Sequence, residues 1–221
     1  MPVTPFDDVP DDAYYTEAVY WAKRCGITNG VSSTCFAPNA TCTRAQSVTF
    51  LWNAAGKPEP SSLTVPFTDV SADAYYYKAL CWAVERKITN GTSGTTFSPN
   101  GIVTRAQAVT MMWRAAGSPE PKTASSFTDV PVSAYYAKAV AWAVENGITN
   151  GMTETTFAPN ATCTRGQSVT FLYRAMGTAP TTVNGFTDVE SNAFCAEAVA
   201  WAVSESFLEG CLLYTSPSPR D

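Results

Sequence analysis

The chain has 221 residues, of which 45% are hydrophobic and only 15% are charged, a composition ample for a folded core that excludes disorder as the default. Histidine is absent, which excludes Ser-His-Asp and Cys-His catalysis and histidine-ligated zinc. The formal net charge of −5 argues against a general nucleic-acid binder.

The chain has no apolar run that approaches the roughly 18 residues of a membrane-spanning helix. Its first residues lack the basic and apolar regions of a signal peptide, so we expect a cytosolic protein or an internal piece of an exported chain. The cysteines form no Cys-x-x-Cys pair, so no metal site is expected, and their odd number excludes complete pairing within one chain. We expect most of them to be small buried hydrophobic residues. They are Cys25, Cys35, Cys42, Cys81, Cys163, Cys195 and Cys211.

Self-comparison reveals a repeat of about 60 residues. The segment Phe-x-Asp-Val recurs at steps of 61, 60 and 59 residues, and a tryptophan follows at the same steps. These positions are Phe6, Phe67, Phe127 and Phe186, and Trp21, Trp82, Trp142 and Trp201. We define unit 1 as residues 6–58, unit 2 as 67–119, unit 3 as 127–178 and a partial unit 4 as 186–210. Residues 211–221 have no counterpart in the other units, and we interpret them as a non-native tail.

Each unit is predicted to begin with a helix that carries an apolar stripe at positions i, i+3, i+4 and i+7. The residues expected as its N-caps are Asp12, Asp73, Ser133 and Asn192. Gly26 and Gly147 suit a left-handed residue at the end of this helix. Lys87 replaces the glycine in unit 2, which predicts a different termination there.

A loop of about 16 residues follows, and its Phe-x-Pro-Asn segment is expected to form an aromatic plug and a turn. The plug residues are Phe36, Phe97 and Phe157. The second helix is predicted to start at Thr43, Thr104 or Thr164 and to end at Gly56, Gly117 or Gly177. Because a two-helix unit of this size cannot bury both of its faces, the units must pack on one another.

The segment Thr-Arg-Ala-Gln opens each second helix, where threonine and glutamine form a capping box. The arginine does not fit this explanation, because a cation at the first helical position opposes the helix dipole. We therefore expect a carboxylate or phosphate to bind there, facing the guanidinium and the free helix amides. The alternative is an ion pair with the aspartate of Phe-x-Asp-Val. The residues concerned are Arg44, Arg105, Arg165, Gln46, Gln107, Gln167, Asp8, Asp69 and Asp129.

Several other residues are weaker candidates for ligand contact. Trp21, Trp82 and Trp142 could stack on a sugar ring, although their helical spacing favours core packing. Adjacent tyrosines such as Tyr75 and Tyr76 cannot all face inward, so some tyrosine must line a groove or the surface. The recurring Asn-Gly predicts a turn whose small residue lets a ligand or backbone approach, and its glycines are Gly30, Gly91 and Gly151. No second acid recurs at a stable offset from the aspartates, so no enzymatic activity is expected.

Five segments recur in order in three units: Phe-x-Asp-Val, the Trp-Ala of the first helix, Ile-Thr-Asn-Gly, Phe-x-Pro-Asn and Thr-Arg-[Ala/Gly]-Gln. In this combination, residues 6–210 resemble S-layer homology (SLH) domains. The resemblance implies a pseudo-three-fold trimer of repeats around a central three-helix bundle. It also implies grooves between units that bind secondary cell-wall polymer, often through a pyruvylated amino sugar. The arginines, aspartates and glycines named above match the family's groove residues, whereas glutamine here replaces the family's glutamate.

The sequence therefore predicts an all-α protein of tandem two-helix repeats with long loops, acting as a non-catalytic module that anchors a larger protein to an anionic wall polymer. No cofactor, nucleic-acid partner or membrane insertion is expected, and the location expected is the bacterial cell wall or surface layer. The chain is expected to be a monomeric pseudo-trimer, with self-association through unit 4 left open. The alternative function is a protein-interaction or self-assembly repeat without a carbohydrate ligand.

Overall fold

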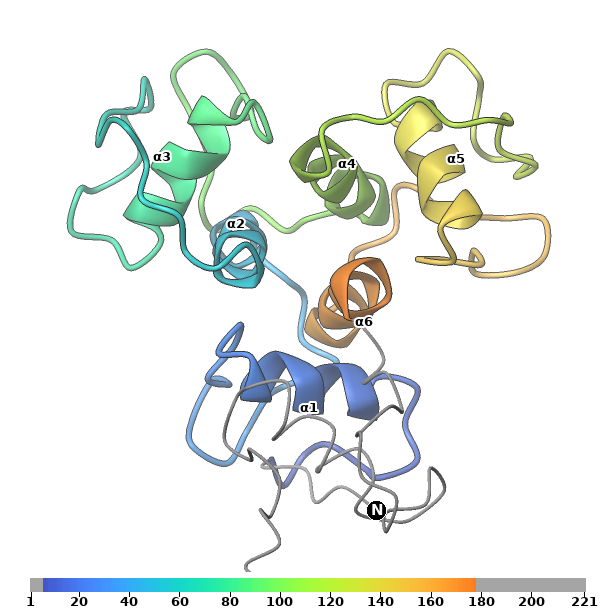
Figure 1. Cartoon of the computed structure of the whole chain (residues 1–221), viewed down its shortest axis with the longest axis horizontal. Helices are drawn as coiled ribbons and strands as arrows, with labels where there is room; N and C mark the ends of the chain where they lie inside the picture. The colour runs from blue at the N-terminus through green and yellow to red at the C-terminus, as the bar shows by residue number, and fades with distance from the viewer. Residues whose placement is uncertain (1–5, 178–221) are drawn as a thin grey trace, which may run out of the picture. The chain divides into compact units, whose positions relative to one another are not determined.

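Six α-helices follow one another through residues 6–177, the part of the chain that this computed structural model describes (Figure 1). They are α1 (Thr16–Arg24), α2 (Arg44–Ala54), α3 (Tyr77–Glu85), α4 (Arg105–Ala115), α5 (Ala137–Glu145) and α6 (Arg165–Met176). Within this range β pairing is limited to isolated bridges between loops, which confirms the all-α class. None of the described helices has the length and hydropathy of a membrane-spanning helix. Unit 4 and residues 211–221 lie outside the described residues.

The first helix of each unit begins later than the sequence pattern predicts. In α1, α3 and α5 a tyrosine occupies the N-cap position and makes no side-chain capping bond. Asp12, Asp73 and Ser133 lie instead in a run of tight turns before the helix. In unit 2, the Tyr77 amide donates to the Ala74 carbonyl at 2.9 Å. The predicted side-chain caps are therefore wrong, because a turn carbonyl already accepts the bond of the first helical amide.

The ends of these helices are alike in all three units. Gly26 and Gly147 are left-handed, with φ of +65° and +66°, as predicted. Lys87 adopts the same conformation with φ of +57°, and the Ile88 amide bonds back to the Ala83 carbonyl at 2.8 Å. The prediction of a different ending in unit 2 is wrong. The helix-ending bonds and the buried isoleucine outweigh the cost of about 1–2 kcal/mol for a left-handed lysine.

The second helices begin with capping boxes, as predicted. In α4 the Gln107 amide donates to Thr104 Oγ1 at 3.3 Å, and the Thr104 amide donates to Gln107 Oε1 at 3.2 Å. The same reciprocal bonds open α2 and α6. Left-handed Gly56 and Gly117 follow α2 and α4, whereas Gly177 at the end of α6 has φ of −67°. The glycine ending is therefore confirmed as a left-handed one in two of the three units.

Each second helix packs on the first helix of another unit. α2 packs against α3, α4 against α5 and α6 against α1, so the contacts run from each unit to the next and from unit 3 back to unit 1. Helices α2, α4 and α6 also contact one another, and Figure 1 shows them between the outer helices. The prediction that the units pack on one another is confirmed. A pseudo-three-fold symmetry axis stays a prediction.

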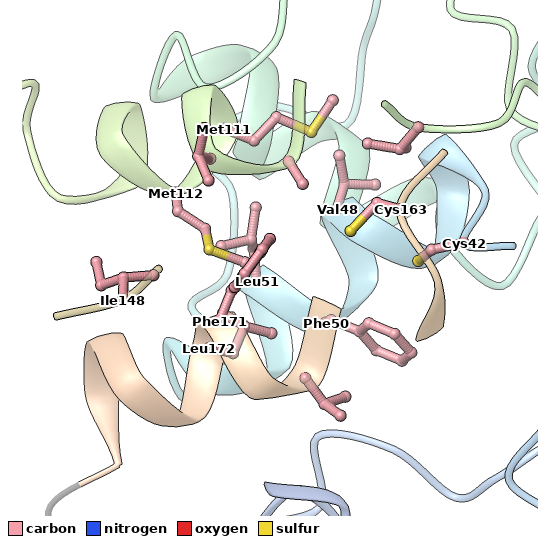
Figure 2. Close-up of a cluster of buried hydrophobic side chains, with 14 of the residues drawn as sticks. Cys42, Val48, Phe50, Leu51, Met111, Met112, Ile148, Cys163, Phe171 and Leu172 are labelled. Carbon is pink, nitrogen blue, oxygen red and sulfur yellow. The ribbon is translucent and has the colours of Figure 1, made fainter. Parts of the chain in front are cut away.

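The core lies where the three second helices meet. Leu51, Met112 and Leu172 converge there from α2, α4 and α6, as Figure 2 shows. The plug residues Phe36, Phe97 and Phe157 are fully buried, as predicted. Burial of these side chains in one continuous cluster ties the three units together.

A closed set of backbone hydrogen bonds joins the segments that precede α2, α4 and α6. The Cys42 amide donates to the Cys163 carbonyl at 2.9 Å, the Cys163 amide to the Val103 carbonyl at 2.8 Å, and the Val103 amide to the Cys42 carbonyl at 2.9 Å. All three side chains are buried, and burial raises the pKa of the Cys163 thiol to about 11. These cysteines fit the expected role of small buried hydrophobic residues, whereas Cys25 is exposed.

We predict that Cys163→Val, which copies Val103 of unit 2, reduces the loss of stability at alkaline pH. The folded-state pKa of about 11 lies above the ordinary value of 9.0, so the thiol favours folding below pH 9 and this contribution is lost as the pH rises towards 11. Urea unfolding should therefore show the wild type losing about 2 kcal/mol more than the variant across this window. The exposed Cys25→Val serves as control, and equal pH dependence of wild type and Cys163→Val would contradict the prediction.

Candidate functional site

The aspartate of each Phe-x-Asp-Val segment holds the loop of its own unit. Asp69 Oδ1 accepts from the Phe97 amide at 2.8 Å, and Asp69 Oδ2 accepts from the Ser98 amide at 2.7 Å. Asp8 and Asp129 make the same pair of bonds in units 1 and 3. Each carboxylate therefore fixes the turn after a buried phenylalanine plug.

The arginine at the start of each second helix reaches the same loop from another unit. Arg44 Nε donates to the Phe97 carbonyl at 2.7 Å, and its guanidinium carbon lies 4.8 Å from the centre of the Phe97 ring. Arg105 holds Phe157 and Arg165 holds Phe36 in the same way. The guanidinium groups are thus buried cross-unit tethers, with only 3–5% of each arginine exposed.

The amides at the start of these helices are already bonded, contrary to the expectation that they are free for an anion. The Arg44 amide donates to the Gly101 carbonyl at 2.9 Å, and the Ala45 amide donates to the Pro99 carbonyl at 3.0 Å. The next amide, of Gln46, donates to Thr43 Oγ1. Three carbonyls of the neighbouring loop, counting that of Phe97, therefore meet the positive end of the dipole and the guanidinium together. They remove the electrostatic conflict without an external ligand.

The alternative of a direct Arg–Asp ion pair is also wrong for the described residues. Their ion pairs within 4.0 Å join Lys78 to Glu59 and Lys138 to Glu120 on the surface. Asp69 still influences Arg44 from a greater distance. Burial lowers the pKa of the Arg44 guanidinium and the Asp69 charge partly offsets this, while the loop amides hold the Asp69 pKa below its ordinary value despite its own desolvation.

Two of the three guanidinium groups retain an unused donor. The Nη2 atoms of Arg105 and Arg165 are buried and have no hydrogen-bond partner in the described structure. In Arg44 the corresponding nitrogen donates to Thr89 Oγ1 at 3.2 Å. A buried cationic donor without a partner is energetically unfavourable, and an acceptor that reached it would remove this cost.

Arg165 lines a groove of about 420 Å³ to which all three units contribute. Unit 1 supplies its Ile-Thr-Asn-Gly loop and one face of α2, unit 2 supplies Tyr75, and unit 3 supplies Arg165. The lining residues are Ile27, Thr28, Asn29, Gly30, Val31, Gln46, Thr49, Phe50, Asn53, Tyr75 and Arg165. Of the residues that the sequence predicts for one site, the structure brings together Gly30, Gln46 and Arg165 but places Asp8 outside the lining.

The repeat places equivalent residues at two further positions. We define site 1 as Gly30, Gln46, Asn53, Tyr75 and Arg165, site 2 as Gly91, Gln107, Arg114, Tyr135 and Arg44, and site 3 as Gly151, Gln167, Arg174, Tyr14 and Arg105. Burial raises the pKa of each of the three tyrosines, and the nearby arginine of the same site partly offsets this shift. At site 1 the tyrosine and the arginine, which belong to different units, also line one groove.

The glycines at these sites are required by the backbone conformation and by the close approach of neighbouring atoms. Gly30 has φ of +83°, and a Cβ there would lie 2.5 Å from Phe6 Cε1 and 2.6 Å from the Cys35 carbonyl oxygen. Gly91 and Gly151 have the same conformation and the same phenylalanine neighbour in their own units. A side chain is excluded at these positions by the fold itself, before any ligand is considered.

The predicted tryptophans do not lie with the groove residues. Trp82 and Trp142 line a separate apolar cavity of about 150 Å³ near the ends of α2, α4 and α6. Trp21 packs against the core, with its ring 5.6 Å from that of Tyr173. These positions agree with the core-packing interpretation that their helical spacing favoured.

Sequence reasoning expected some tyrosine at a groove or the surface without identifying which one, and of the α2 residues in the groove it named Gln46 but missed Thr49, Phe50 and Asn53. Tyr14, Tyr75 and Tyr135 recur at the repeat spacing and are 62%, 68% and 63% exposed, whereas each following tyrosine packs on the core. This spacing was a usable signal. Asn53 had none, because units 2 and 3 carry arginine at its position.

Among the described residues, no cluster of His, Cys, Asp or Glu could hold a metal ion.

We predict that Arg105→Met lowers the free energy of unfolding by about 2 kcal/mol or more. The substitution keeps the length of the side chain but leaves the buried Phe157 carbonyl without its donor and removes the cation from two phenylalanine rings. The matched change Lys138→Met, on an exposed face of α5, should shift stability by less than about 0.5 kcal/mol. If urea unfolding showed equal losses of stability for the two variants, the role of Arg105 as a cross-unit tether would be contradicted.

We also predict that Asp69→Asn destabilises the protein at neutral pH and that the difference shrinks in acid. Because the pKa of Asp69 is lowered in the folded state, its contribution is present above about pH 4 and is lost as the pH falls through the folded-state value. Thermal unfolding at several pH values measures this difference. The exposed Asp73→Asn should cause little change, and a difference independent of pH would count against the carboxylate's role.

Comparison with known proteins agrees with this geometry. The model of the S-layer homology domain matches residues 5–46, 66–109 and 126–167, more than half of the chain. The surface-layer 125 kDa protein of Lysinibacillus sphaericus is 34% identical over 156 residues, which are 69% of this chain and 13% of that protein. An endoglucanase of Bacillus sp. (strain KSM-635) is 37% identical over 117 residues, 53% of this chain and 12% of the enzyme.

The cellulosome-anchoring protein of Acetivibrio thermocellus is 25% identical over 210 residues, which are 90% of this chain and 45% of that protein. This chain therefore spans less than half the length of each of these three relatives. The family match falls on three successive segments, and each contains the start of a second helix with its cross-unit arginine. The chain belongs to the S-layer homology domain family.

Proposed function

We propose that residues 6–177 form a non-catalytic module that anchors a larger protein to the bacterial cell surface by binding an anionic wall polysaccharide. The observation that carries this proposal is the buried Nη2 of Arg165, which has no partner in the described structure and belongs to a residue lining the groove of site 1. A planar guanidinium edge is a favourable partner for a carboxylate, such as that of a pyruvylated sugar.

The shape and the other residues of the groove suit a sugar. Its volume of about 420 Å³ is within the range of small-molecule sites. Tyr75 offers an aromatic face for a sugar ring, while Gln46 and Asn53 offer amides to hydroxyl groups. On a chain with a net charge of −5, a local cationic donor favours one fixed anionic group over general polyanion binding.

The names of the relatives support the same location. They include a surface-layer protein, a cell surface protein and a cellulosome-anchoring protein. Enzymes among the relatives match only a small share of their own length, 12% in the endoglucanase and 9% in an amylopullulanase. We therefore propose the cell wall or surface layer as the location of this chain and the wall polymer as its partner.

The test is co-sedimentation of the protein with purified wall sacculi that carry pyruvylated polymer. Arginine-to-alanine changes would confound this test, because the arginines also tether the units. The main variant is therefore the triple Tyr14→Ala, Tyr75→Ala, Tyr135→Ala, which alters exposed side chains. We predict that it sediments at least about tenfold less, as expected for the loss of aromatic contacts at each site, while its far-UV circular dichroism is unchanged.

The matched control replaces exposed apolar residues that line none of the three sites, Val132→Ala and Leu63→Ala. Removal of pyruvate from the sacculi by mild acid should abolish binding of the wild type. Undiminished sedimentation of the tyrosine variant, or wild-type binding that survives the loss of pyruvate, would contradict the proposal. A concentration-dependent increase in mass without wall binding, measured by light scattering, would favour the self-assembly alternative.

A further inference from the structure

One position differs in charge between the three sites. Asn53, Arg114 and Arg174 occupy the same place in α2, α4 and α6, at repeat steps of 61 and 60 residues. Each side chain donates to the carbonyl of the isoleucine in the Ile-Thr-Asn-Gly loop. Asn53 Nδ2 reaches Ile27 at 2.9 Å, Arg114 Nη1 reaches Ile88 at 3.3 Å and Arg174 Nη1 reaches Ile148 at 3.4 Å. The structural bond is thus shared, whereas the charge is not.

The carbonyl occupies one nitrogen of each arginine. Within residues 6–177, the guanidinium groups of Arg114 and Arg174 make no other hydrogen bond or ion pair, so their remaining donors have no partner among these residues. Arg114 is half-buried and Arg174 is exposed. The bond to the isoleucine carbonyl holds Arg114 and Arg174 against the loop equivalent to the one that lines the groove beside Asn53 in site 1. Asn53, which lines the groove of site 1, supplies no charge there.

The buried arginines add a second difference. Arg105 in site 3 and Arg165 in site 1 each retain an unpartnered Nη2, while Arg44 in site 2 donates to Thr89. Site 3 is therefore the only one of the three defined sites that combines an unpartnered buried guanidinium with a second cation. Site 1 has the unpartnered buried guanidinium but no second cation. Site 2 has the second cation, but its buried guanidinium has a partner.

We propose that the three sites are unequal and that site 3 is the primary anion site, with Arg174 as its specificity-determining residue. Site 1, where Asn53 replaces the arginine, discriminates least between charged and uncharged sugars. This inference rests on the proposed function, and it adds which site binds the anionic group most tightly and which residue is responsible. The chemical class of ligand is a sugar that carries one carboxylate.

The test is a titration of the whole chain with the methyl glycoside of a 4,6-pyruvylated N-acetylhexosamine and, separately, with the same glycoside lacking pyruvate. Met152 stands in unit 3 at the position of the groove residue Val31, and it is 56% exposed. Its ¹³C-methyl resonance therefore reports on site 3, while isothermal titration calorimetry reports the overall affinity. For the wild type, we expect the Met152 resonance to shift at the lowest concentrations of the pyruvylated probe.

The key variants exchange the differing residues. Arg174→Asn should weaken the tightest binding of the pyruvylated probe about tenfold or more, the order expected for one charge-assisted hydrogen bond, and should leave the pyruvate-free probe unaffected. Asn53→Arg should strengthen binding at site 1 by a similar factor. Arg86→Asn, an equal change of charge on an exposed residue at the end of α3, serves as control.

The outcomes separate the two levels of the account. If the wild type binds the pyruvylated probe and Arg174→Asn behaves like Arg86→Asn, the inequality of the sites is wrong and the proposed function stands. If the wild type binds neither the probe nor the sacculi, the proposed function fails and this inference fails with it. A Met152 resonance that shifts only after most of the binding heat has been released would also overturn the assignment to site 3.

Discussion

The hydrogen bonds between the start of each second helix and the loop of another unit are the interaction on which the rest of the structure depends. Backbone amides at the helix start and the arginine Nε donate to three carbonyls of one loop, such as those of Phe97, Pro99 and Gly101. An aspartate of the unit that owns this loop also fixes it, because its carboxylate accepts hydrogen bonds from two loop amides. Because the contact runs from unit 1 to 2, from 2 to 3 and from 3 to 1, no unit can lose it without exposing buried polar groups of its neighbours.

The same interaction also positions the charged groups of the candidate site. A guanidinium that is held by Nε and stacked on a phenylalanine ring presents its outer nitrogens in a fixed direction. At site 1, Arg165 lines a groove that is also bordered by a glycine loop that cannot accept a side chain and by a tyrosine from another unit. Preorganisation of this kind reduces the entropy lost on binding, which suits the polymer-binding role that we propose.

Local sequence patterns predicted the helices and the caps of the second helices. They could not predict which distant residues bond to the arginines and aspartates. The capping boxes and the buried phenylalanine plugs each follow from a few neighbouring residues. The carbonyl that accepts from Arg44 Nε belongs to a residue 53 positions away, so an argument from the dipole of one helix could infer a missing partner but assigned it to a ligand. An ion pair between these arginines and the aspartates is an alternative that the sequence leaves open, but two loop amides bind each carboxylate instead. Comparison of the repeats could not identify Asn53 as a groove residue, because the residue at its position differs between the units.

A crystal structure of this chain saturated with a pyruvylated disaccharide tests the central claim most directly. The account predicts a carboxylate oxygen within about 3 Å of Nη2 of Arg105 or Arg165, with the Nε bonds to Phe157 and Phe36 intact. Such a complex would show one side chain acting as both tether and receptor. A disaccharide bound with its carboxylate in solvent, or at a surface remote from all three guanidinium groups, would contradict it.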